Sequence, residues 1–101
     1  MKILDNSDKH LQSILPEIIS EKLNRTAVKF RFIGGGSYGR VYKTVLSDGE
    51  AIAVKGYRLQ GMQAEEAQQL RLLSENTSVK MPQVLFTYED EDTAVLAMSY
   101  V

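Results

Sequence analysis

The sequence predicts an α+β fold: a five-stranded antiparallel sheet with one packed helix, preceded by an N-terminal helical segment. Three features of the chain support this prediction. Apolar residues recur at spacings of three and four over about the first 25 residues, alternating apolar residues separated by turn signals follow, and one further helical stretch interrupts them. The resulting order, a helix and then β-β-β-α-β-β, is typical of an antiparallel sheet that packs one helix across a face.

The N-terminal segment, residues 1–25, has an apolar stripe that predicts a packing helix without chemistry of its own. The stripe consists of Leu11, Ile14, Leu15, Ile18, Ile19 and Leu23. Pro16 would cost a helix interior one hydrogen bond, so two arrangements stay open: either Ser13 caps a helix whose first turn contains Pro16, or two short helices meet there. His10, in the same segment, is expected at the surface.

Residues 26–101 are expected to form one lobe that holds the whole sheet. Val28, Phe30 and Phe32 alternate along a first strand, which predicts that their side chains share one side of it up to Gly34. The other expected elements are the strands 41–46 and 51–57, the helix 62–74, and the strands 84–86 and 94–101. Asp48-Gly49 predicts a hairpin between two of these strands, and the acidic stretch 89–92 predicts a solvated turn rather than a metal site.

Composition excludes several classes of function. Twelve Lys and Arg against thirteen Asp and Glu provide no global basic field for nucleic acid or an anionic membrane. The absence of cysteine rules out disulfides, thiolate zinc sites, iron–sulfur clusters and cysteine nucleophiles. No apolar run has the length of a membrane span and no signal-peptide core is present, so we expect a cytoplasmic domain with no metal site of its own.

The main motif is Gly34-Gly35-Gly36-Ser37-Tyr38-Gly39-Arg40-Val41, which satisfies the pattern G-x-G-x-x-G-x-V. A Rossmann fingerprint needs its glycines between a strand and a helix, whereas the residues after Gly39 are strand-like. A Walker loop would need a Gly-Lys-Ser/Thr sequence, which is absent. Two interpretations remain: a flap between antiparallel strands whose backbone N–H groups cover nucleotide phosphates, or a plain hairpin tip.

Lys55 favours the flap. Its side chain shares one face of the expected third strand with Ala51, Ala53 and Tyr57, and a lysine among alanines needs a partner for its ammonium group. The sequence Ala-Ile-Ala-Val-Lys, which ends 16 residues after Gly39, matches the kinase strand whose lysine holds the α- and β-phosphates. The alternative is a lysine that extends into solvent from a sheet edge.

Glu66 is the expected partner of Lys55. In the helix 62–74, Met62, Glu66, Leu70 and Leu73 share one face. An unpaired carboxylate in this apolar stripe would be costly, whereas Glu65 is rotated about 100° away and is expected to face solvent. The alternative is that both glutamates are surface residues.

Residues 26–101 resemble the N-terminal lobe of the protein-kinase-like fold. The resemblance is carried by the glycine motif, by Ile52-Ala53-Val54-Lys55, by the helix around Glu66, and by Val79-Lys80-Met81-Pro82-Gln83-Val84-Leu85. These segments are most similar to the aminoglycoside phosphotransferase and choline/fructosamine kinase group. Gly39 is more typical of protein kinases, and the 11-residue interval from Lys55 to Glu66 is short for either branch.

The resemblance implies a nucleotide site. Lys55 and Glu66 would be its catalytic pair, and the residues that bind ATP would be Ile33, Gly34, Gly35, Gly36, Ser37, Tyr38, Gly39, Val41, Ala53, Lys55, Met98, Ser99 and Val101. Met98 would be the gatekeeper, with Ser99 and Val101 in the hinge. The catalytic base, the carboxylates that bind Mg²⁺ and the site for a small-molecule acceptor would belong to a second lobe, because no H-x-D loop or D-F-G follows in these residues.

The expected function is therefore the ATP-binding N-lobe of a small-molecule phosphotransferase, present as a fragment that is inactive alone. Three alternatives stay open: the N-lobe of a protein kinase, a non-catalytic module that binds a nucleotide or a partner, and an unrelated sheet domain with a coincidental glycine hairpin. Without a second lobe, the apolar residues Ile33, Val41, Ala53, Met98, Tyr100 and Val101 are expected to face water and to promote self-association.

Overall fold

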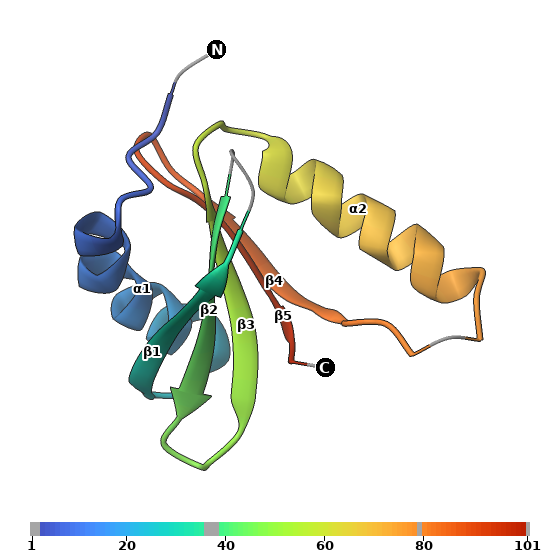
Figure 1. Ribbon diagram of the computed structural model, residues 1–101, viewed down its shortest axis with the longest axis horizontal. Coiled ribbons are helices and arrows are strands. Elements are labelled where there is room, and N and C mark those ends of the chain that lie inside the picture. Colours follow the sequence, from blue (N-terminus) through green and yellow to red (C-terminus); the bar gives the residue numbers. More distant parts are fainter. Residues whose placement is uncertain (1–2, 36–38, 79, 101) are drawn as a thin grey trace.

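The computed structural model describes residues 3–35, 39–78 and 80–100. Within these ranges the chain forms five strands and two helices, which confirms the predicted fold class (Figure 1). The elements are α1 (Asp8–Leu23), β1 (Ala27–Gly34), β2 (Gly39–Leu46), β3 (Ala51–Tyr57), α2 (Met62–Glu75), β4 (Val84–Glu89) and β5 (Ala94–Ser99). The element order α-β-β-β-α-β-β is the one that the sequence predicts.

The sheet has the strand order β1-β2-β3-β5-β4, and every neighbouring pair is antiparallel. Strand β3 is therefore central and presents its two faces to different helices. Its Ile52 and Val54 pack with α1, whereas its Tyr57 packs with Ala67 of α2. Since successive side chains of a strand point to opposite faces, α1 and α2 cover opposite faces of the sheet, as their separation in Figure 1 also shows.

Helix α1 is one continuous helix that contains Pro16, so neither arrangement predicted for this proline is correct. Ser7, not Ser13, is the N-cap, and its hydroxyl accepts a hydrogen bond from the backbone N–H of His10. Burial of the apolar stripe of α1 against the sheet stabilises the helix despite the hydrogen bond that Pro16 cannot make. Asn24 ends the helix in the left-handed conformation, with φ of 54°.

Two smaller sequence predictions also need correction. The ladder between β1 and β2 shifts its register between Ala27 and Lys29, so Val28 does not share a face with Phe30 and is 61% exposed. Phe30 and Phe32 do lie together, because both rings make edge contacts with Tyr42. His10 is half-buried rather than a plain surface residue, since its ring lies 3.3 Å from the Thr93 hydroxyl.

The predicted turns are confirmed. Gly49 has φ of 90° and donates its backbone N–H to Leu46 in the β2–β3 hairpin, while Arg25 bridges Asp48 and Glu50 beside it. Neither of the helices in the described ranges has the length and apolar character needed to span a bilayer.

Candidate functional site

The predicted pair of Lys55 and Glu66 is present. The Nζ atom of Lys55, on β3, lies 3.1 Å from Oε1 of Glu66, on α2. Both side chains are half-buried, and Glu65, one residue earlier on the helix, is exposed as expected. The connection between β3 and α2 is short enough to bring the two together across an 11-residue interval, and Gly61 makes the turn with φ of 89°.

Tyr57 is a third member of this group that the sequence analysis did not assign. Its hydroxyl donates a hydrogen bond of 2.5 Å to the same Oε1 atom of Glu66, and the Lys55 ammonium lies 4.9 Å from the centre of its ring. Burial and the hydrogen bond to Glu66 raise the pKa of Tyr57. The signal that could have revealed this contact was the placement of Tyr57 on the same strand face as Lys55.

The two ends of the glycine motif are fixed by steric requirements. Gly34 and Gly35 have φ of 129° and 149°, which side chains rarely adopt, and a Cβ atom on Gly35 would overlap the carbonyl of Gly39. A Cβ atom on Gly39 would overlap the aliphatic stem of Lys55. Gly39 therefore lies directly over the lysine. Gly36, Ser37 and Tyr38, predicted to bind phosphates, lie outside the described residues.

The four residues predicted to line an adenine site lie on neighbouring strands. In the ladders Val41 pairs with Gly34 and with Lys55, and Ala53 pairs with Met98. Ile33 is 46% exposed, and Val41 and Met98 are half-buried. Ala53 is only 8% exposed, so the prediction that it faces water is wrong.

A contact between Lys43 and Tyr100 crosses the strand that carries Ala53. Lys43 pairs with Ala53 from β2, and its ammonium lies 4.7 Å from the centre of the Tyr100 ring, beyond β5. The two side chains therefore meet across β3, on the same face as Lys55. The sequence analysis did not assign a role to Lys43.

The hinge residues are only partly accessible for a ligand. The backbone N–H of Ser99 donates to the carbonyl of Gln83, and the Ser99 hydroxyl accepts from the Gln83 N–H. This N–H is therefore used inside the protein, so an adenine edge bound at Ser99 would have to use its carbonyl. Val101 lies outside the described residues.

Basic side chains gather on the Lys55 face. Lys43 pairs with Arg31 on one side and with Ala53 on the other, which places Arg31, Lys43 and Lys55 on the same face of the sheet. Glu66 is the carboxylate that contacts Lys55 there. Such a face favours an anionic ligand.

The acidic turn is exposed and is held by hydrogen bonds to Asp90. Asp90 accepts hydrogen bonds from the Tyr88 hydroxyl and from the Asp92 backbone, and Asp90, Glu91 and Asp92 are exposed. In the part of the chain that the structure describes, no group of three His, Asp or Glu side chains could hold a metal ion. The turn is the solvated hairpin that the sequence predicts.

Comparisons with known proteins agree with this geometry. No family model matches the chain. The chain is 41% identical over 63 residues, 58% of its length, to the MAP kinase kinase kinase SSK2 of Saccharomyces cerevisiae. A solved structure assigned as a fructosamine-3-kinase from Thermobifida fusca matches 86% of the chain with a TM-score of 0.67 and 25% identity.

The chain spans only a small part of both proteins, 4% of the yeast kinase and 31% of the fructosamine-3-kinase structure. The strand order, the ion pair and the two matches together identify the chain as an N-terminal lobe of the protein-kinase-like fold.

Proposed function

We propose that this lobe binds ATP through the glycine motif and Lys55, and that it serves as the nucleotide-binding part of a small-molecule phosphotransferase. The observation that carries the proposal is the 3.1 Å ion pair between Lys55 and Glu66, placed directly beneath Gly39. Because the ion pair already holds the lysine side chain in place, its ammonium group can contact phosphate oxygens with little further loss of conformational freedom.

Each part of the site has a distinct contribution. The backbone at Gly34 and Gly35 can approach phosphates closely because no Cβ atom intervenes. Lys55 would neutralise charge on the α- and β-phosphates, and Glu66 would hold Lys55 with Tyr57 bonded to the same oxygen. Ile33, Val41 and Met98 provide apolar surface for the adenine ring once Lys43 moves away from Tyr100.

Mg²⁺ would be bound by carboxylates of a second lobe, and its charge would stabilise the transferring phosphoryl group. The base that activates the acceptor and the acceptor site itself would come from the same lobe. The lobe on its own is therefore expected to bind ATP without turnover with any acceptor. The similarity to a fructosamine-3-kinase supports a small-molecule acceptor.

The test is a calorimetric titration of the 101-residue chain with ATP. The account predicts saturable binding that Lys55→Met weakens by at least about tenfold, since charged groups in such sites contribute about 1.5–3 kcal/mol. Lys9→Met, at an exposed lysine of α1, is the matched control and is expected to leave the affinity unchanged. Equal affinity in Lys55→Met and in the chain itself would refute the proposed site.

A second candidate is the N-lobe of a protein kinase, which the 41% identity to a MAP kinase kinase kinase favours. The two candidates differ in the second lobe. If the gene continues into H-x-D-x-x-x-x-N followed by D-F-G, the protein kinase is supported, and a different catalytic loop supports the small-molecule enzyme. A stop codon directly after Val101 would instead support a non-catalytic binding module.

A further inference from the structure

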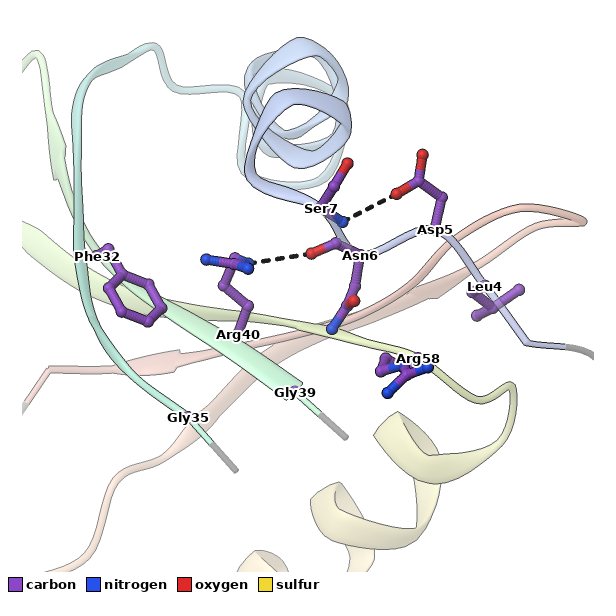
Figure 2. A pocket seen from close by; sticks show the side chains of 9 residues that line it. All are labelled: Leu4, Asp5, Asn6, Ser7, Phe32, Gly35, Gly39, Arg40 and Arg58. Atoms are coloured by element: carbon purple, nitrogen blue, oxygen red, sulfur yellow. Dashed lines mark hydrogen bonds between the residues drawn. The ribbon is translucent and has the colours of Figure 1, made fainter. Parts of the chain in front are cut away.

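A pocket of about 520 Å³ lies on the sheet face opposite Lys55 (Figure 2). It opens between the segment before α1 and the loop end of the β1–β2 hairpin, where Gly35 and Gly39 lie. Phe32 and Arg40 line it, and both alternate along their strands with residues of the Lys55 face, Ile33 and Val41. The pocket is therefore separate from the proposed nucleotide site, although Gly35 and Gly39 border both.

The walls of this pocket are held by contacts between distant parts of the chain. The backbone N–H of Leu4 donates to the carbonyl of Arg58 at 2.6 Å, and Ile3 forms a bridge with Leu59. Arg40 donates from Nε to the carbonyl of Asn6 at 3.1 Å. These contacts fix the segment before α1 against the ends of β2 and β3, so the pocket is preformed.

The pocket has an excess of positive charge. Arg40 and Arg58 both line it, in Figure 2 on either side of Asn6, and the Arg40 guanidinium lies 5.1 Å from the centre of the Phe32 ring. The Arg58 side chain makes no hydrogen bond or ion pair with the other described residues. Asp5 is the acidic residue of the lining, and its carboxylate already accepts from the Ser7 backbone N–H. The lining residues therefore carry one net positive charge, Asp8 lies near Arg40 at the side of the pocket, and the Arg58 guanidinium is free.

We propose that this pocket binds a small phosphorylated molecule. Its phosphate would accept hydrogen bonds from Arg58 and Arg40, because the planar guanidinium presents paired donors at the spacing of phosphate oxygens. Its organic part would lie against Phe32, a residue that is 55% exposed beside the arginines. The volume lies within the range of about 300–1,000 Å³ usual for pockets that bind small molecules. The site goes beyond the nucleotide function and does not depend on it.

The test uses phenyl phosphate as the probe, followed residue by residue through the backbone amide NMR signals of the 101-residue chain at constant ionic strength. The proposal predicts saturable shifts at Asn6, Phe32 and Arg58, with a weaker response to inorganic phosphate and none to phenol. Benzoate tests whether the pocket prefers a carboxylate or a phosphate. If benzoate binds as tightly as phenyl phosphate, the assigned ligand class is wrong.

Three variants sharpen the test. Arg58→Gln, at an exposed side chain, is expected to weaken phenyl phosphate binding at least about tenfold, whereas Arg71→Gln, an exposed arginine of α2, is the control and leaves it unchanged. Lys55→Met is also expected to leave it unchanged, which separates this pocket from the nucleotide site. The proposal is overturned if the pocket amides do not shift at millimolar probe, if Arg58→Gln binds like the control, or if Lys55→Met abolishes the shifts.

Discussion

The two faces of the sheet use the same strands for different purposes. On the face under α1, Tyr42, Ile52 and Val54 are closed to solvent with Leu15 and Ile19 of the helix. On the opposite face a smaller core under α2 buries Tyr57 and Leu96, and beside it Lys55 is joined to Glu66 of α2 by an ion pair. The α1 face carries the larger core, whereas the Lys55 face combines a smaller core with charged side chains that a ligand could contact. Both faces can be built from the same strands because successive side chains point to opposite sides.

The largest difference between the faces is expected in stability. Leu15→Ala removes a fully buried side chain from the α1 face and is expected to reduce the free energy of unfolding by about 2–5 kcal/mol. Leu73→Ala, at a 53% exposed leucine of α2, is the control and is expected to change it by no more than about 0.5 kcal/mol. Urea unfolding measures both, and comparable losses would show that the two faces do not differ in this way.

The ion pair between Lys55 and Glu66 predicts that mutations of the two residues have coupled effects on stability. In a double-mutant cycle of Lys55→Met and Glu66→Gln, the interaction between the two changes is expected to be about 0.5–3 kcal/mol, because the side chains share one hydrogen-bonded group. Tyr57→Phe is expected to cost about 1–3 kcal/mol, since it removes a donor to the same carboxylate. Simple additivity in the cycle would contradict the account of a preassembled pair.

We also expect the chain to self-associate through exposed apolar residues of the Lys55 face. Ile33 and Tyr100 remain 46% and 43% exposed, and Val41 and Met98 are half-buried nearby. Covering this surface is favourable, although its small apolar area makes the expected association weak, with a dissociation constant in or above the high-micromolar range. Sedimentation should detect it, and Ile33→Ser and added ATP should each reduce it. A chain that stays monomeric at high concentration would contradict this prediction.

The smallest expected effect on stability concerns the hydrogen bond between Tyr42 and Asp8 on the α1 face. The hydrogen bond from the Tyr42 hydroxyl lowers the pKa of Asp8 below its usual 3.8. A carboxyl whose pKa is lower in the folded state contributes stability above its unfolded pKa, and loses it as the pH falls through the folded value. Tyr42→Phe should therefore lose less stability than the unaltered chain between about pH 5 and pH 3. Identical acid profiles in urea unfolding would show that the contact contributes nothing.

The sequence predicted the elements and the ion pair because both depend on local patterns. The alternation around Lys55 and the helical spacing at Glu66 placed the two side chains on facing surfaces. Contacts between segments far apart in the sequence produce no periodic pattern from which they could be predicted. Examples are the reach of Lys43 to Tyr100 and the contact of Arg40 with Asn6.

At Pro16 and Val28 the local sequence pattern gave a wrong prediction, because tertiary packing determined the structure there. Local rules predicted that a helix starts near Pro16 or breaks there, and that Val28 shares a face with Phe30. The structure has one continuous helix α1 and a register shift in β1 instead. Tertiary burial outweighs one missing hydrogen bond, and a single extra residue in a strand reverses which face a side chain occupies. These outcomes could not be obtained from spacing alone.

The most direct test of the central claim is an ATP titration mapped by the backbone amide NMR signals of Arg58→Gln, in which the pocket on the α1 face is disabled. The account predicts saturable shifts at Gly39, Val41, Lys55 and Met98, with little change at the buried residues of α1, and their loss in Arg58→Gln combined with Lys55→Met. Shifts that persist in that double variant, or that fall on the α1 face alone, would contradict the assignment of the Lys55 face as the nucleotide site.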